Sequence, residues 1–378
     1  MALKIAIVTE YYYPLLGGIT ENVHHTAIRL RAHGHTVKII TSGVNGLALP
    51  DHEHTEPAAE VIRIGRSIPV RGNGSVARAT VGMHLWRDLR AMFVREQFDI
   101  AHLHSPLVFT LPAMSVLASP CRSVGTFHTF FEGSRLYVGL RSVLQKQFLD
   151  KMDGQSFVSR SCIDSLAPFF RLKDPRVIPN GVDMSMFSPA VPRLEEFDDR
   201  KRTLLFLGRF DPRNGLGLML EAFALVKRRF PDVRLIVVGD GEQRAFYERM
   251  VPADMRGDVH FVGPALAKRP RYYATSDIFC SPVSKASFGV TLLEAMASGK
   301  PIVATDNVGY RDLLSPDEST LVPPASPAAF ADAIADLFTN DHRRREMGEN
   351  GVKKAARYSW DRVVEATLDF YHEILNRP

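Results

Sequence analysis

The sequence predicts an α/β protein with two doubly wound, parallel-sheet domains, and two observations carry that prediction. The chain has 378 residues, which is more than one domain usually holds and enough for two domains that each bury a core. In both halves, continuous apolar runs alternate with helical patterns. Strands that are apolar throughout belong to parallel sheets covered by helices on both faces.

The two halves begin with the same succession of strand, glycine-containing turn, helix and strand. In the first half, the regular elements are expected at residues 4–8, 21–32 and 37–40. In the second half, they are expected at residues 203–207, 218–229 and 233–238, with a loop at 208–217. Two such beginnings, roughly 200 residues apart, predict two separate domains.

Domain limits follow from these repeats and from a segment with prolines and mixed charges. The expected parts are an N-terminal domain at 1–185, a linker at 186–202, a C-terminal domain at 203–358 and a terminal segment at 359–378. The terminal segment has the pattern of an amphipathic helix over residues 360–375.

Composition bounds the class of protein. Hydrophobic residues make up 45% and charged residues 24% of the chain, as in soluble globular proteins. Cys121, Cys162 and Cys280 lie far apart and form no CxxC pair, which fits a reducing compartment. No apolar run approaches the roughly 18 residues that span a bilayer, and the first residues lack the layout of a signal peptide. We therefore expect a cytoplasmic protein.

The formal net charge of +5 points to an anionic partner. Nucleic acid is not expected, because the chain has no Lys/Arg block with interleaved aromatic residues and no recognised binding module. Residues 71–95 combine Arg78, Arg87 and Arg90 with apolar side chains such as Trp86. We expect a basic amphipathic helix there, which either lies on an anionic membrane or packs on its own domain with a solvated basic face.

The most informative motif is the stretch from Phe288 to Asp306. It predicts a turn at Gly289, a short helix that carries Glu294, and a buried strand. Glycine lets the backbone approach a ligand, and the first helical turn, which begins near Val290, offers N–H groups to an anion. Glu294 lies about one turn further on, where a carboxylate is able to bind ribose hydroxyls. The stretch suits a phosphate-plus-sugar ligand, although an ordinary βα turn has the same pattern.

Two strand ends carry further groups suited to an anion. Gly17 and Gly18 precede Thr20, an expected helix cap, so their amides suit an anion, although a tight turn with positive φ also needs glycine. Arg209 closes the first strand of the second domain, where a guanidinium is able to fork onto a diphosphate; the alternative is a plain surface arginine. Arg213 is a weaker candidate for the same task.

Histidines end two strands of the first domain. His104 and His128 each follow an apolar run, although a lone histidine is more often a satisfied core or surface residue than a catalytic one. His102 with His104, and the acidic, histidine-rich stretch 51–56, would suit a metal ion, but neither has a further cluster of ligands. No D-x-D motif occurs, so we expect no metal.

Five further motifs follow one another along the chain, at residues 13–18, 125–129, 178–183, 207–210 and 237–241. Together with the 288–306 stretch, they resemble the retaining glycosyltransferases of the GT-B fold, in particular glycosyltransferase family 4, over nearly the whole chain. His104-Ser-Pro and Thr126-Phe-His-Thr are similar to the phosphatidylinositol mannosyltransferases of that family. Neither half has G-x-G-x-x-G after its first strand, which argues against the rival interpretation of an NAD-dependent oxidoreductase.

This resemblance implies two Rossmann-like domains that face a central cleft, with a terminal helix that crosses back to the N-terminal domain. It also implies transfer of a hexose, of mannose or glucose type, from a GDP- or UDP-linked sugar to a hydroxyl acceptor such as an inositol lipid. The transfer would retain anomeric configuration and need neither metal nor cofactor. Such an enzyme would work in the cytoplasm, at the inner face of the cell membrane when its acceptor is a lipid.

The resemblance also assigns roles to individual residues. The catalytic residues that it implies are His128, Arg209 and Glu294. The acceptor-side residues that it implies are Tyr13, Thr20 and His104. The donor-binding residues that it implies are Gly17, Gly18, Arg209, Arg213, Asn214, Ala286, Phe288, Gly289, Val290 and Glu294.

Two positions depart from the family's pattern. Ala286 stands eight positions before Glu294, where the family has a glutamate that holds the hydroxyls of the donor sugar. Asn214 stands where the family has a lysine that helps to neutralise the diphosphate. A different hypothesis follows, in which the chain is a weakened homologue that binds nucleotide without efficient turnover. The retained Arg209, His128 and Glu294 argue against it.

Overall fold

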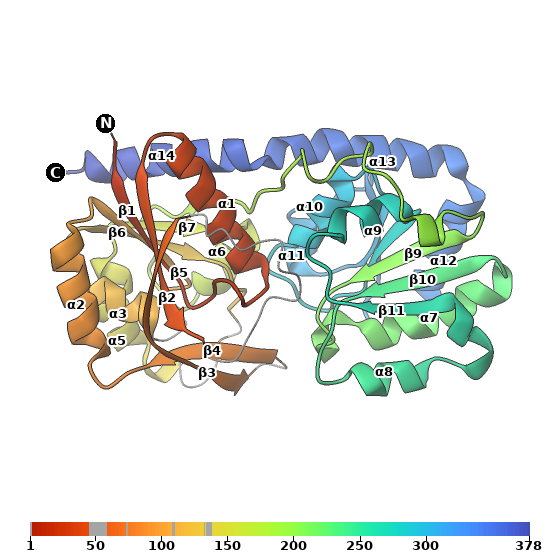
Figure 1. The fold of residues 1–378 in the computed structure, drawn as a ribbon, viewed down its shortest axis with the longest axis horizontal. Helices are drawn as coiled ribbons and strands as arrows, with labels where there is room; N and C mark the ends of the chain where they lie inside the picture. The colour runs from red at the N-terminus through yellow and green to blue at the C-terminus, as the bar shows by residue number, and fades with distance from the viewer. Residues whose placement is uncertain (1, 45–58, 73–74, 108–109, 132, 134–137) are drawn as a thin grey trace. The chain divides into compact units, whose positions relative to one another are not determined.

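The computed structural model describes residues 2–44, 59–72, 75–107, 110–131, 133 and 138–378. The chain forms two compact units (Figure 1). Unit 1 contains Met1–Asn180 and Trp360–Pro378, and unit 2 contains Gly181–Ser359. Each unit has its own sheet and its own hydrophobic core, as the two similar halves of the sequence predict.

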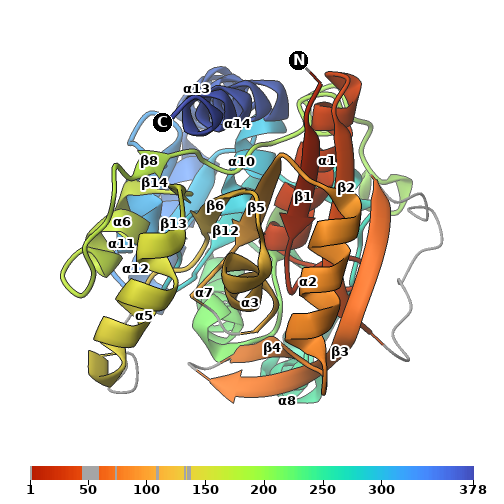
Figure 2. The same ribbon diagram turned by 90° about the vertical axis from the view of Figure 1, so that its left-hand side faces the viewer.

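Unit 1 is built on a sheet whose described part has eight strands in the order β4-β3-β2-β1-β5-β6-β7-β8. The strands are β1 (Lys4–Val8), β2 (Thr36–Gly43), β3 (Glu60–Gly72), β4 (Ser75–Val81), β5 (Ile100–His104), β6 (Arg122–Phe127), β7 (Gly154–Phe157) and β8 (Arg176–Val177). The strands pair in parallel apart from β3 and β4, which form an antiparallel hairpin at one edge (Figure 2). The helices are α1 (Gly18–Ala32), α2 (Leu85–Glu96), α3 (Leu111–Ala118), α5 (Arg141–Gln147), α6 (Arg160–Leu166) and α14 (Trp360–Leu375).

Unit 2, whose residues are all described, has a parallel sheet of six strands in the order β11-β10-β9-β12-β13-β14. The strands are β9 (Arg202–Leu207), β10 (Val233–Val238), β11 (Val259–Gly263), β12 (Ile278–Ser281), β13 (Ile302–Thr305) and β14 (Ser319–Val322). The helices are α7 (Leu216–Arg229), α8 (Arg244–Met250), α9 (Arg269–Thr275), α10 (Val290–Ala297), α11 (Val308–Arg311), α12 (Pro327–Thr339) and α13 (Asp341–Ala355).

The terminal helix α14 groups with unit 1, where it packs beside α1. Its apolar face, which includes Val364, Tyr371 and Ile374, is buried in the core of that unit, and burial of apolar surface contributes about 25 cal/mol per Å². Gly154 of β7 permits the close approach, because a Cβ there would lie 2.6 Å from Cζ of Phe370. The apolar face of this amphipathic helix therefore packs in the core of unit 1, although the 179 residues of unit 2 separate α14 from the rest of unit 1 in the chain.

The segment 186–202, expected as a linker, is instead packed into unit 2, and the border between the units lies at 180/181 rather than at 185. Phe187 and Phe197 are buried, and the Arg234 guanidinium lies over the Phe197 ring at 5.3 Å. The backbone N–H of Leu194 also donates to Oγ1 of Thr275 at 2.9 Å. The prolines and charges of this segment are typical of a linker, but its apolar side chains bind it to the sheet.

The expectation of a basic helix over residues 71–95 is wrong for the first half of that range. Arg78 lies on β4, opposite Pro69 of β3, and only Arg87 and Arg90 lie on the helix α2. The short run of β-branched residues around Arg78 favours a strand, and the backbone N–H of Arg78 donates to the Tyr11 hydroxyl at 3.0 Å. Among the described residues, no helix is both long and apolar enough to cross a membrane.

Candidate active site

The order of strands reverses at one point in each sheet, and open α/β sheets bind ligands at such switch points, beyond the carboxyl ends of the strands. In unit 1, β1 lies between β2 and β5, and in unit 2, β9 lies between β10 and β12. The predicted site residues follow these strands. Those of unit 1 come after β1, at the last residue of β5 and after β6, and those of unit 2 come after β9 and β12.

In unit 2, the loops after β9 and β12 are joined by their backbones. Ser284 donates to the carbonyl of Arg213 through its backbone N–H at 2.9 Å and through its hydroxyl at 3.1 Å. Gly215 has φ 76°, and a Cβ there would lie 2.1 Å from the carbonyl oxygen of Pro282. The glycine is therefore required for this contact, which holds the segment with Arg213 and Asn214 beside the segment that leads to Ala286.

Arg209 is the cation at the carboxyl end of β9. Its side chain is 51% exposed and pairs with Asp211, with 2.8 Å between Nη2 and Oδ2. The Asn214 side chain is a neutral amide, so it does not supply the charge of a lysine. It donates to the carbonyl of Arg209 at 2.7 Å and so braces the loop. Arg213 is exposed. The positive charge of the loop after β9 therefore comes from Arg209 and Arg213, and Asp211 partly offsets it.

Gly289 is the N-cap residue of helix α10 and has φ 130°, a region that favours glycine. A Cβ there would lie 2.7 Å from Cδ1 of Leu292 and 3.1 Å from Cε1 of Tyr310. Packing therefore requires glycine at this position whether or not a ligand binds. Phe288, the residue before it, is buried and contacts the Tyr358 ring at 6.3 Å between centroids. Val290, the first residue of α10, is half-buried.

Ala286 lies on the same loop and is half-buried. Its carbonyl oxygen packs against α11, since a Cβ at Gly309 would lie 2.1 Å from that oxygen. Asn307 caps α11 and donates from Nδ2 to the carbonyl of Val283 at 2.9 Å. The backbone around residue 286 is therefore held against α11 and its cap residue, so a longer side chain there would start from a defined position.

Glu294 on α10 is buried and already has partners. Tyr273 donates its hydroxyl to Oε2 at 2.9 Å, and Nη2 of Arg269 lies 3.2 Å from Oε1. Burial, together with the Glu294 carboxylate, raises the pKa of Tyr273 well above its usual range, so the phenol remains a donor. The Glu294 carboxylate is thus held in one orientation near the start of α10. Sequence reasoning missed Arg269 and Tyr273, because they lie on α9, more than 20 positions before Glu294.

In unit 1, the turn after β1 presents bare backbone. A Cβ at Gly17 would meet no atom within 4 Å among the described residues, and helix α1 starts at Gly18 without a side-chain cap. The expectation that Thr20 caps this helix is wrong, because the cap position is Gly17 and Thr20 donates its hydroxyl to the carbonyl of Leu15 at 2.6 Å. Thr20 is fully buried. The N–H groups of the first turn of α1 therefore remain suited to an anion.

Tyr13 and the histidines line the rest of this edge. The Tyr13 hydroxyl donates to Oε1 of Glu21 at 3.2 Å. His104 ends β5 and His128 follows β6, and Nδ1 of His104 lies 2.8 Å from Nε2 of His128. The two rings stack with centroids 5.0 Å apart. The structure thus brings together two histidines that were predicted separately.

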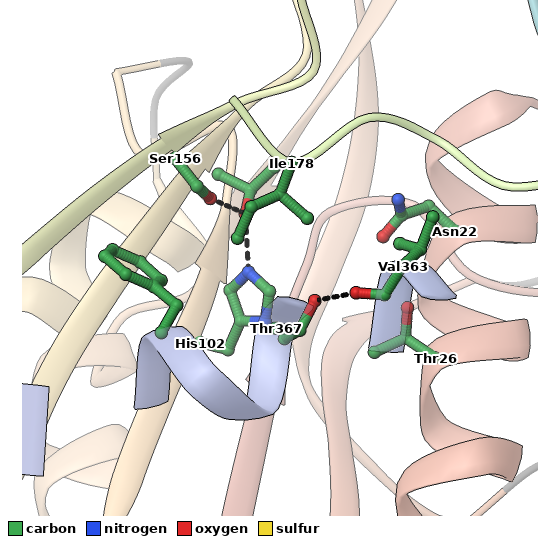
Figure 3. A pocket seen from close by; sticks show the side chains of 9 residues that line it. Asn22, Thr26, His102, Ser156, Ile178, Val363 and Thr367 are labelled. Atoms are coloured by element: carbon green, nitrogen blue, oxygen red, sulfur yellow. Dashed lines mark hydrogen bonds between the residues drawn. The ribbon is translucent and has the colours of Figure 1, made fainter. Parts of the chain in front are cut away.

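His102 belongs to the core rather than to the site. Its Nδ1 lies 2.6 Å from the Tyr371 hydroxyl and its Nε2 lies 2.6 Å from Oγ1 of Thr126. It borders a cavity of about 10 Å³ (Figure 3), which has room for about one water molecule. The cavity is lined by Asn22, Thr26, His102, Thr126, Ser156, Ile178, Val363, Thr367 and Phe370. This space is too small for a sugar.

No metal centre is found in the part of the chain that the structure describes, where no group of three or more His, Cys, Asp or Glu side chains is arranged to hold an ion. The stretch 51–56, considered above as an alternative metal site, lies outside the described residues.

Known proteins share both halves of this architecture. Residues 16–186 match the family model described as Glycosyltransferase Family 4, and residues 190–354 match the one described as Glycosyl transferases group 1. A phosphatidyl-myo-inositol mannosyltransferase of Mycobacterium tuberculosis is 30% identical over an alignment of 387 residues that covers 98% of this chain and 97% of that protein. A GDP-mannose-dependent alpha-mannosyltransferase of Mycolicibacterium smegmatis is 28% identical, with 99% and 98% covered. The crystal structure of a glycosyltransferase from Rickettsia africae superposes with a TM-score of 0.80 at 19% identity and covers 100% of both chains.

The chain has two Rossmann-like units, and each has groups suited to a ligand at its switch point. Together with these similarities, this architecture defines a glycosyltransferase of the GT-B fold. The likeness to the Rickettsia structure supports the fold alone, whereas the mannosyltransferases cover nearly the whole chain in sequence. The chain belongs to glycosyltransferase family 4.

Proposed function

We propose that this enzyme transfers a hexose, of mannose or glucose type, from a GDP- or UDP-linked sugar to a hydroxyl acceptor, with retention of anomeric configuration. An inositol-type lipid is the proposed acceptor, since the relative from Mycobacterium tuberculosis is named for phosphatidyl-myo-inositol. The observation that carries the proposal is the edge of unit 2, where exposed Arg209 and the start of α10 follow the two strands of the switch point.

Departure of a nucleoside diphosphate needs stabilisation of its growing negative charge. In our proposal, this charge is stabilised by Arg209, Arg213 and the first amides of α10. Because these groups are already in place, they stabilise the charge without reorganisation. The Glu294 carboxylate, fixed by Tyr273 and Arg269, holds the ribose. The leaving phosphate takes the proton of the acceptor hydroxyl on the same face of the sugar, so no dedicated base and no metal are required.

Release of nucleoside diphosphate tests this function directly. We expect GDP or UDP to be released from GDP-mannose or from UDP-glucose, faster with phosphatidylinositol vesicles than without, and at the same rate in the presence of EDTA. A rate that EDTA abolishes would contradict metal independence. If the protein binds GDP or UDP but releases no nucleoside diphosphate from any donor of the panel, the alternative of a weakened homologue would be favoured. Ala286 and Asn214 support that alternative.

We also propose that unit 1 binds the inner face of the membrane through α2 and the adjacent hairpin, as a peripheral protein of the cytoplasm. One face of α2 is buried and includes Leu85, Leu89 and Met92. The other face is exposed and carries Arg87 and Arg90. Next to them, Met83 is 93% and Trp86 is 49% exposed, which suits insertion at a lipid interface. Nη1 of Arg90 donates to the carbonyl of Ala118 at 2.9 Å, so its charge is held near the surface.

Replacing Arg78, Arg87 and Arg90 together by glutamine should weaken binding to phosphatidylserine vesicles about a hundredfold at low salt. Each basic side chain near an anionic surface contributes roughly 1 kcal/mol. Vesicle sedimentation measures the binding, and added salt should weaken it as well. The matched control replaces Arg228, Arg249 and Arg256, three exposed arginines of unit 2, and should leave binding within about threefold. Equal affinity for neutral and anionic vesicles would contradict the proposal and favour a soluble acceptor.

A further inference from the structure

The hydrogen bond between His104 and His128 leaves two ring nitrogens to be accounted for. His104 is 1% exposed, and its Nε2 is buried without a hydrogen-bond partner among the described residues. His128 is partly exposed, and in the described part of the chain its Nδ1 makes no hydrogen bond. Nδ1 of His128 is therefore the atom of this pair that is open to a ligand.

Both rings are neutral at physiological pH. Burial lowers the pKa of His128 to about 3, with a smaller contribution from His102, and burial also holds the pKa of His104 well below its usual range. A neutral imidazole carries one N–H and one bare nitrogen. The bond of 2.8 Å between the rings therefore uses one proton, and the position of that proton decides the tautomer of both histidines.

Two arrangements are available. If Nδ1 of His104 carries the proton, Nε2 of His104 is a bare nitrogen, and His128 accepts at Nε2 and carries its own proton on Nδ1. If Nε2 of His128 carries the proton, His104 must bury an N–H at Nε2 that has no acceptor, and Nδ1 of His128 is bare. Orphaned buried N–H groups are rarer in proteins than under-used acceptors, so the first arrangement is favoured.

We propose that His104 is a positioning residue that donates from Nδ1 to Nε2 of His128 and thereby fixes His128 as a neutral donor through Nδ1. In the chemistry proposed above, on which this inference rests, His128 then meets the substrate as a hydrogen-bond donor and does not act as a general base. This assignment fits a reaction in which the leaving phosphate takes the acceptor's proton.

The surroundings hold His104 in place for this task. The His102 ring stacks with the His104 ring, with centroids 4.4 Å apart. The backbone N–H of Ser105 donates to the carbonyl of Thr126 at 2.8 Å, which ties the ends of β5 and β6 together. His102 imposes no tautomer on His104, because both of its own nitrogens contact hydroxyls, and a hydroxyl either donates or accepts.

Nitrogen NMR of the intact protein labelled with ¹⁵N-histidine tests the tautomer without any assay of activity. His128→Asn assigns the resonances by difference, because the chain has 13 histidines. We expect Nδ1 of His128 to be protonated and its Nε2 to be bare. The reverse pattern, or a positively charged ring at neutral pH, would overturn the proposal. This result stands apart from the proposed function, since it does not depend on whether any sugar nucleotide is turned over.

Two amide variants then separate positioning from packing. The amide nitrogen of asparagine lies about where Nδ1 of histidine lies, and that of glutamine lies about where Nε2 lies. His104→Asn should therefore keep His128 protonated at Nδ1, and it should transfer mannose from GDP-mannose about tenfold faster than His104→Gln does. Thermal unfolding of both variants checks the fold. Equal rates, or equal His128 spectra, in two folded variants would contradict the proposal.

Discussion

Arg209→Ala is expected to lower kcat/KM for the sugar nucleotide by about a hundredfold or more, with the fold intact. Arg209 is exposed at the end of β9, and its planar guanidinium is able to bind two diphosphate oxygens at once. Its removal also leaves Asp211, now 2.8 Å from the guanidinium, without that partner and facing an anionic ligand. Steady-state kinetics with the best donor of the panel measure the loss.

Three companion variants sharpen this test. Arg209→Lys should recover only part of the rate, because an ammonium is a point charge that does not fork. Arg209→Ala combined with Asp211→Asn should recover part of the lost affinity for nucleoside diphosphate, because it removes the repulsion. Arg256→Ala, at an exposed arginine of the same unit, should leave the rate within about twofold. An unchanged rate in Arg209→Ala would remove this residue from the site.

Ala286→Glu should raise transfer or hydrolysis of at least one sugar nucleotide by about tenfold to a thousandfold. A well-placed hydrogen bond made in the transition state contributes a few kcal/mol. The backbone at residue 286 is already held against Gly309 of α11, so a new carboxylate would be added to an ordered loop. Affinity for GDP or UDP should change little, because the carboxylate would contact the sugar rather than the phosphates.

Turnover of both forms on the same donor panel, alongside calorimetric binding of GDP and UDP, measures this gain. Ala286→Gln is the matched control, since it has the same length without the charge, and it should gain less than Ala286→Glu. No gain on any donor, in a protein that still binds nucleotide, would mean that the site has diverged at more than this residue. The weakened homologue or a different donor would then be the better hypothesis.

Much of the fold was predictable because the signal is local. The strand at residues 233–238 and the helix at 360–375 have the predicted bounds, since a continuous apolar run and a helical period are readable without knowledge of their partners. The hairpin around Arg78 was not predictable in this way. Its residues mix charged and apolar side chains, and pairing with β3 decides in favour of a strand.

By itself, the sequence determined that two α/β domains exist, that both carry anion-suited strand ends, and that the chain resembles family 4. Only the tertiary structure decided that residues 186–202 pack into unit 2 and that Tyr273 and Arg269 hold Glu294. It alone decided that His104 bonds to His128, 24 positions away. The physical reason is that sequence periodicity reports which residues are buried, whereas the partner of a buried polar group depends on how strands and helices far apart in the chain are brought together.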